Sequence, residues 1–209
     1  IATFCHNIAR DIPIIIDNPK TKLNLVYIDD VLSELINAIK GLENKVDDYC
    51  EISKTYNKTL GEIAELIKSF KKNRKDFYIP NMSDDFIKKL YSTYLSYLPN
   101  DQFNYSLKMN NDLRGSFSEF LKTTDKGQIS INISRPNIVK GNHWHHSKVE
   151  KFLVVCGKGV IRFRGIYSDD IIEYFISGEK LEVIDVPVGY THNIQNIGDV
   201  DMVTIMWAN

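Results

Sequence analysis

The period of the apolar residues changes once along this chain, close to Leu107. Beyond this point apolar and polar side chains alternate, as in the run GQISINIS at residues 127–134. Further strand-like runs follow at residues 150–165, 170–176, 180–186 and 201–207, separated by glycine, aspartate and asparagine. A period of two places successive side chains on opposite faces of a strand. The second half of the chain is therefore predicted to be an all-β sandwich or barrel.

The first half follows the helical period instead. The pattern predicts helices over residues 28–41 and 58–72, and a third from Ser83 to Leu98 that Pro99 ends. Thr59 and Glu62 have the spacing of a capping box at the start of the second helix. The expected apolar faces are Val31, Leu32, Leu35, Ile36 and Ile39; Ile63, Leu66, Ile67 and Phe70; and Phe86, Ile87, Leu90, Tyr94 and Leu98. Short strands are expected at residues 13–16 and 49–53.

These segments predict an α+β chain with a boundary near residues 99–106. Residues 1–105 are expected to be a partial α/β segment, and residues 106–209 an all-β domain. The predicted helices and short strands of the first part include no sheet large enough to bury them all. We therefore expect residues 1–105 to be one part of a larger domain, and the chain, which begins at Ile1, to be a fragment of a longer protein.

Charge and composition exclude some classes of partner. The net charge of −1 among 209 residues provides no electrostatic reason for nucleic-acid binding. No apolar run approaches the length of a membrane span, and no signal peptide is visible. Cys5, Cys50 and Cys156 are scattered, which is typical of reduced thiols. We expect a cytoplasmic protein without nucleic-acid or membrane partners.

Three of the five histidines lie within residues 143–146, and two of them have the spacing of metal ligands. His143 and His145 would project from the same face of an extended strand, and Glu150 can return to that side. His192 follows on a later strand, after a turn shaped by Pro187 and Gly189. Three imidazoles and a carboxylate suit zinc, iron, manganese or nickel, and these donor types do not choose between them.

The same residues support an acid/base interpretation. A histidine inside a barrel can abstract a proton next to a ketone. Lys148 is two residues from Glu150, so on a strand both side chains would project from the same face. Lys148 is therefore a candidate for the cation that holds a phosphate or a developing enolate. Tyr190 is either rim packing or a catalytic acid. A histidine nitrogen that binds a metal cannot accept a proton, so ligation and base catalysis compete at His143.

At these positions the sequence resembles the cupin family. Its first motif is matched by Gly141, His143, His145, Glu150 and Gly157, and its second by Pro187, Gly189, His192 and Asn196. Gly141 is closer to the histidines than usual, and Leu181 stands where the second motif usually begins with glycine. The resemblance implies a double-stranded β-helix (jelly-roll) barrel and a metal site formed by His143, His145, Glu150 and His192, with zinc the favoured metal.

The segment NDLRGSFSEF at residues 111–120 is similar to one in cupins that epimerise or isomerise deoxysugar nucleotides. Asp112, Arg114, Gly115, Phe117 and Glu119 match that motif. The resemblance implies that Arg114, Phe117 and Glu119 help to bind a nucleotide sugar and that His143 is the base, with Lys148 or Tyr190 near the sugar.

Residues 21–39, TKLNLVYIDDVLSELINAI, resemble the carboxy-terminal part of extended short-chain dehydrogenase/reductase (SDR) proteins. An SDR domain followed by a cupin is typical of bifunctional epimerase–reductases of capsular polysaccharide biosynthesis. That resemblance implies C3 epimerisation of a UDP-4-keto-6-deoxy-N-acetylhexosamine by the cupin, and reduction at C4 by NADPH, on the route to UDP-N-acetyl-L-fucosamine. This chain lacks the Gly-rich loop and the Tyr-x-x-x-Lys pair, so NADPH is expected only in the full-length protein.

The family resemblance also implies a homodimer that binds a UDP-sugar. Two rival functions remain open at this point. One is an iron-dependent cupin oxygenase, and the other is a non-catalytic metal-binding cupin for sugar binding or dimerisation.

Overall fold

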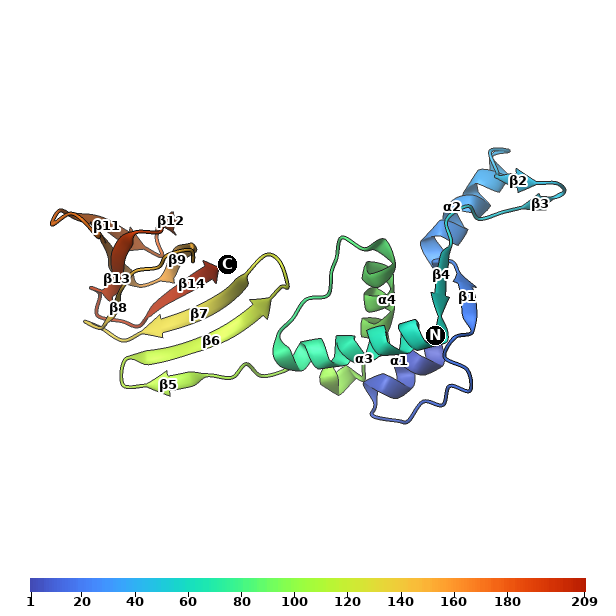
Figure 1. Ribbon diagram of the computed structural model, residues 1–209, viewed down its shortest axis with the longest axis horizontal. Coiled ribbons are helices and arrows are strands. Elements are labelled where there is room, and N and C mark those ends of the chain that lie inside the picture. The colour runs from blue at the N-terminus through green and yellow to red at the C-terminus, as the bar shows by residue number, and fades with distance from the viewer. The chain divides into compact units, whose positions relative to one another are not determined.

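The computed structural model describes all 209 residues, and these form two compact units (Figure 1). The first contains residues 1–76 and 80–104, and the second contains residues 77–79 and 105–209. Apart from residues 77–79, the chain passes from the first unit to the second after residue 104. The assignment of residues 1–105 to a reductase fold stays a prediction.

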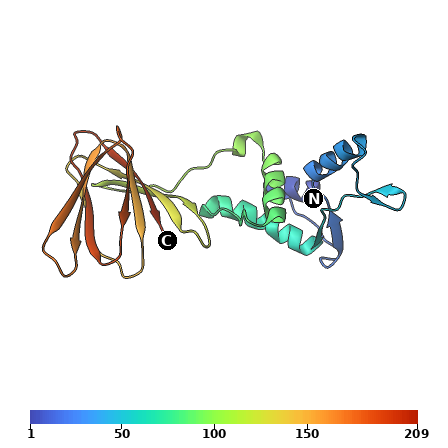
Figure 2. The same cartoon turned by 90° about the horizontal axis from the view of Figure 1, so that it is seen from above.

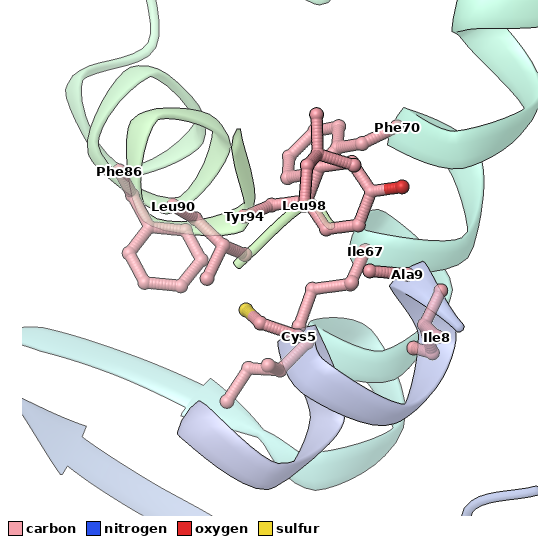
Figure 3. Packing of buried hydrophobic residues seen from close by; sticks show 10 residues of the cluster. Cys5, Ile8, Ala9, Ile67, Phe70, Phe86, Leu90, Tyr94 and Leu98 are labelled. Carbon is pink, nitrogen blue, oxygen red and sulfur yellow. The ribbon is translucent and has the colours of Figure 1, made fainter. Parts of the chain in front are cut away.

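Three helices form the core of the first unit: α1 (Ala2–Ala9), α3 (Leu60–Asp76) and α4 (Asp85–Ser96). Their buried side chains interlock in one cluster around Tyr94 and Phe70, which are each 1% exposed (Figure 3). The predicted capping box at α3 is confirmed, since Glu62 accepts from the Thr59 backbone N–H at 2.7 Å and Thr59 Oγ1 accepts from the Glu62 N–H. Asp84 caps α4 by accepting from the Ile87 N–H at 3.0 Å.

The other elements of this unit are short. Strands β1 (Lys22–Leu25) and β4 (Tyr56–Thr59) pair antiparallel, and so do β2 (Lys45–Val46) and β3 (Tyr49–Cys50). Helix α2 spans Ile28–Ile39, and a single 3-10 turn, η1, spans Asn100–Gln102.

Several expectations for the first unit are wrong. Residues 13–16 form no strand, and the strand expected at 49–53 is reduced to Tyr49–Cys50. Helix α1 has no counterpart among the predicted elements. The apolar face of α2 is exposed, with Leu35 at 57% and Ile39 at 87%.

The second unit consists of two antiparallel sheets (Figure 2). The larger has the order β12-β9-β14-β7-β6-β5, and the smaller β11-β10-β13-β8. The strands of the larger sheet are β5 (Asn110–Asp112), β6 (Gly115–Lys122), β7 (Gln128–Ser134), β9 (Glu150–Cys156), β12 (Val183–Val186) and β14 (Met202–Ala208). Those of the smaller sheet are β8 (Val139–His143), β10 (Lys158–Gly165), β11 (Ile171–Ser177) and β13 (Tyr190–Asn196).

The core of this unit lies between the two sheets. Phe152, Val154 and Met202 of the larger sheet pack in one cluster with Ile161 and Ile194 of the smaller one. The predicted strands at residues 127–134, 150–165, 170–176 and 201–207 are present, and the one predicted at 180–186 is shortened to Val183–Val186. Strands β9 and β10 do not pair with each other, because the chain passes from one sheet to the other at Gly157, where φ is +83°. The architecture is the predicted two-sheet β domain.

None of the helices is long and apolar enough to cross a membrane.

Candidate metal centre

Four potential ligands converge inside the second unit. His143 ends β8 and lies opposite His192 of β13, Glu150 begins β9, and His145 lies in the loop between β8 and β9. One ligand atom from each of these residues lies within 4.8 Å of the others. The expectation that one strand carries both His143 and His145 is wrong, because β8 ends at His143. The loop nevertheless returns the His145 ring to within 4.8 Å of the His143 ring, centroid to centroid.

The two oxygens of Glu150 have different surroundings. Oε1 accepts from Lys148 Nζ at 2.6 Å. Oε2 lies 3.2 Å from His192 Nε2 and 3.4 Å from His145 Nε2, but it accepts no hydrogen bond. His145 Nε2 is also buried without a hydrogen-bond partner. Buried polar atoms without partners are costly, so this arrangement fits a cation between them.

The side of the His192 ring that faces away from Glu150 is also in contact with the protein. Its Nδ1 lies 3.4 Å from the carbonyl oxygen of Tyr190, and its ring packs against Phe152 and Phe163. A proton on Nδ1 leaves Nε2, which faces Glu150, unprotonated and available as a ligand. A backbone carbonyl on the distal nitrogen is a common support for a metal-binding histidine.

The electrostatics also favour cation binding. Burial works to raise the pKa of Glu150, but His192 and Lys148 outweigh it and lower the pKa to about 2. Burial, together with His192 and His145, lowers the pKa of His143 below its usual value. The cluster therefore offers an ionised carboxylate and, at His143, an imidazole that favours the neutral form, as ligation requires. The donors can hold a divalent metal, and their chemistry does not choose which one.

A β-bulge turns His143 toward the interior. The register between β8 and β13 pairs His143 with His192, Gly141 with Asn193 and Lys140 with Ile194. His192 and Ile194 are both buried, so Lys140 and His143, although three residues apart, lie opposite interior positions. The bulge depends on Gly141 and Asn142, whose φ angles are +108° and +63°.

Lys140 is a half-buried cation that the sequence analysis did not single out. Its Nζ donates to Asn132 Oδ1 at 2.7 Å and to the Ile133 carbonyl at 2.9 Å, and burial lowers its pKa. On a regular strand, Lys140 and His143, three residues apart, would project from opposite faces. Only knowledge of the bulge could therefore have revealed the position of Lys140.

The proposed catalytic residues lie beside the cluster. Lys148 contacts Glu150, as its parity predicts, while Trp144 packs on His146 away from the ligands. Tyr190 lies two residues before His192 on β13 and lines a pocket. The aromatic neighbours Phe152 and Phe163 were missed as site residues, although Phe152 has the same strand parity as Glu150.

The predicted substrate-binding residues are not all brought together. Phe117 pairs with Asn132, Asn132 with Thr204, and Thr204 with Val154, so Phe117 shares the interior face of the sheet. Glu119 has the same parity, and it forms an ion pair with Lys122.

Arg114 lies apart from the cluster. It is exposed in the turn between β5 and β6, where it pairs with Asp112. The adjoining Gly115 pairs with Ser134, whereas Glu150 is level with Ala208 and Gln128 at the opposite end of the sheet. Along strands of this length, the level of Gly115 and the level of Glu150 are about 20 Å apart.

Comparison with known proteins identifies one matching family and several similar proteins. Residues 110–209 match the family described as polysaccharide biosynthesis C-terminal domain. The chain is 43% identical over its full length to 56% of a Pseudomonas aeruginosa protein named UDP-2-acetamido-2,6-beta-L-arabino-hexul-4-ose reductase.

Two solved structures of CapF are also similar. Capsular polysaccharide assembling protein CapF from Staphylococcus aureus is 56% identical over 99% of this chain and 57% of that chain, with a TM-score of 0.96. CapF with the inhibitor 3-isopropenyl-tropolone is 56% identical over 99% of this chain and 61% of that chain, with a TM-score of 0.97. The chain therefore spans 56–61% of the length of these relatives. The predicted fold, a helical α/β segment followed by a cupin-like β domain, is confirmed.

Proposed function

Since residues 110–209 form a polysaccharide biosynthesis C-terminal domain and the whole chain is a close homologue of CapF, we propose that this chain modifies a nucleotide sugar for capsule synthesis. The reaction we assign to the β unit is epimerisation at C3 of a UDP-4-keto-6-deoxy-N-acetylhexosamine. The ketone at C4 acidifies the C3 proton, so one base and one acid on opposite faces of the sugar suffice.

The observation that carries the proposal is the convergence of His143, His145, Glu150 and His192 within 4.8 Å. We propose that these residues hold zinc or another divalent cation. When bound, such an ion supplies a positive charge that polarises the C4 oxygen. Lys148 holds Glu150 through the 2.6 Å contact to Oε1 and so keeps Oε2 directed at the histidines.

His143 is our candidate base. It is the exposed member of the four, and its lowered pKa keeps the imidazole neutral near pH 7. The other three members of the cluster lie close together, since Glu150 Oε2 is within 3.4 Å of Nε2 on both His145 and His192. We propose that His143 is not a ligand during turnover: His145, Glu150 and His192 would hold the cation, and the free His143 nitrogen would accept the C3 proton. Tyr190, on the neighbouring strand, is the candidate acid that returns a proton to the other face.

Phe117 and Glu119, on the interior face of the larger sheet, are proposed to contact the nucleotide sugar. Arg114 lies at the other end of that sheet, so in this proposal it does not contact the reacting sugar ring. Reduction at C4 by NADPH, the homodimer and the supply of UDP-N-acetyl-L-fucosamine precursors are proposed only for a protein of the relatives' full length, since this chain spans 56–61% of them.

Solvent deuterium exchange tests the proposal. Folded, metal-loaded protein should incorporate deuterium at C3 of the 4-keto sugar, as read by mass spectrometry. His143→Ala should lower the exchange rate by about 100-fold or more, the usual range for a lost general base. His146→Ala is the matched control, because His146 packs on Trp144 outside the cluster and its loss should leave exchange intact.

Two results would contradict the proposal. Absence of exchange with folded, metal-loaded protein would show that the β unit is no epimerase, and saturable sugar binding in that case would indicate a non-catalytic module. Iron in place of zinc, with oxygen consumption, would indicate an oxygenase.

A further inference from the structure

A pocket of about 340 Å³ lies where the edges of the two sheets approach each other. It lies between β11, the edge strand of the smaller sheet, and β12, the edge strand of the larger one. Its walls include Phe163, Ile172, Tyr174, Ile184 and Tyr190. This size is at the lower end of the range of about 300–1,000 Å³ for small-molecule sites.

The pocket shares a wall with the candidate metal centre. Phe163 lies directly opposite His192 in the register of β10 and β13, and their ring centroids are 6.3 Å apart. Tyr190 also lines the pocket, and its carbonyl oxygen faces His192 Nδ1. A molecule in this pocket therefore contacts two residues that flank His192.

The chemistry of the walls limits what can bind. Aromatic and aliphatic side chains dominate, and neither lysine nor arginine lines the pocket. Its charged residue, Asp185, is paired with Lys151. The rim is unusually apolar for solvent-facing residues, with Ile172 44% and Tyr174 46% exposed. Such walls disfavour a diphosphate, and they suit the C–H faces and the methyl group of a deoxysugar.

We propose that this pocket binds the 6-methyl group and the adjoining edge of the pyranose ring, with C3 and C4 directed toward the ligand cluster and with the diphosphate and the base outside the pocket. The assignment rests on the proposed function for the identity of the sugar. Phe163 and Tyr174, whose rings lie 5.9 Å apart in an edge-to-face arrangement, form an aromatic wall for the ring. The hydroxyl of Tyr190 is the polar group that orients it.

Two neighbouring residues on β11 provide a matched test. Ile172→Trp fills the pocket, whereas Ile171→Trp adds the same bulk at the adjacent position, which does not line this pocket and is 63% exposed. Binding of the 4-keto nucleotide sugar and of UDP alone is measured by calorimetry on metal-loaded protein. We expect Ile172→Trp to weaken binding of the nucleotide sugar at least tenfold, and to leave UDP binding within twofold. Ile171→Trp should change neither.

These binding measurements test the pocket assignment independently of epimerase activity. Equal affinities for the nucleotide sugar in the two variants would overturn the pocket assignment, even where C3 exchange proceeds. An equal loss for UDP would overturn it too, since the pocket would then hold the nucleotide. If Ile172→Trp does not fold, saturation-transfer NMR on the unsubstituted protein decides. The 6-methyl protons should then receive more saturation than the uracil protons, and the reverse result would refute the assignment. Sugar binding without exchange would count against the proposed function alone.

Discussion

Oε2 of Glu150 lies 3.2 Å from Nε2 of His192, is buried, and accepts no hydrogen bond. The other carboxylate oxygen is engaged by Lys148. Burial works to raise the pKa of Glu150, but His192 and Lys148 lower it to about 2, so the carboxylate stays ionised at any ordinary pH and Oε2 is available to a cation. With two imidazole nitrogens within 3.4 Å of that oxygen, a divalent cation is the partner that fits.

Loss of the Lys148 contact should weaken metal binding without removing a ligand. Lys148→Met frees Glu150 Oε1 to rotate, so zinc affinity should fall about 10–100-fold, the usual effect of losing the outer partner of a ligand. Lys151→Met is the matched control, because Lys151 pairs with Asp185 rather than Glu150. Competition with a chromophoric chelator measures both. Equal affinities in the two variants would show that Lys148 does not orient the carboxylate.

Gly141 should be the most sensitive glycine of the site. A Cβ at this position would lie 2.8 Å from the His192 carbonyl oxygen and 2.9 Å from the Asn193 Cα, and the backbone has φ +108°. Gly141→Ala should therefore displace β8, cost about 1–3 kcal/mol or more of unfolding free energy, and abolish high-affinity metal binding.

Gly189→Ala separates backbone strain from steric clash. Gly189 also has a positive φ, +77°, but a Cβ there meets nothing within 4 Å. We expect a loss of about 1–2 kcal/mol in urea unfolding and intact metal binding. If Gly141→Ala bound metal as well as Gly189→Ala, the bulge would not be what positions His143.

The four residues that converge in the cluster could be singled out from the sequence, because histidine and glutamate at these spacings are typical of a metal site. The path of the chain between them could not. Lys140 and His143 lie opposite interior positions only because of a bulge at Gly141 and Asn142, which exists in the pairing with β13 and leaves no periodic signal within β8. Arg114 illustrates the same limit, since a matching motif does not reveal that the turn lies at the far end of the sheet.

In the first unit, local sequence patterns did not predict several elements correctly, because tertiary contacts decide whether those elements form. Helix α1 has only eight residues, and it is stabilised by burying Cys5 and Ile8 against α3 and α4 rather than by its own propensity. Residues 13–16 have β-forming side chains but no partner strand, so they remain without regular structure. Helix α2 lies within the predicted range and ends two residues earlier, at Ile39, yet periodicity alone could not reveal whether anything covers its apolar face.

The exposed face of α2 should be tolerant of polar substitution. Leu35 and Ile39 are 57% and 87% exposed, so Leu35→Ser and Ile39→Ser remove little buried area. Each should change the unfolding free energy by no more than about 0.5 kcal/mol, and both should reduce binding of a dye that reports exposed apolar surface. Ile67→Ala, at a fully buried position of α3, should cost about 2–5 kcal/mol. Comparable losses at Leu35 and Ile67 in urea unfolding would contradict the structure.

The three cysteines should differ in reactivity and in their effect on stability at high pH. Burial raises the pKa of the Cys5 thiol to about 11, whereas Cys50 and Cys156 are exposed (Figure 3 shows Cys5 within the helical core). At pH 8 an alkylating reagent should modify Cys50 and Cys156 rapidly and Cys5 only after unfolding. Equal modification of all three in the folded protein would refute this.

The sign of the pH effect on Cys5 follows from the raised pKa. The folded protein keeps the thiol proton up to about pH 11, while the unfolded chain loses it near its ordinary pKa of about 8.5. The contribution of Cys5 to stability is therefore fully present below about pH 8.5 and is lost as the pH rises toward 11. Relative to Cys5→Ala, which has no thiol to ionise, the unsubstituted protein should lose unfolding free energy between pH 8.5 and 10.5. Urea unfolding of both proteins at several pH values measures the difference, and a constant difference would show that the Cys5 thiol ionises as readily in the folded protein as in the unfolded chain.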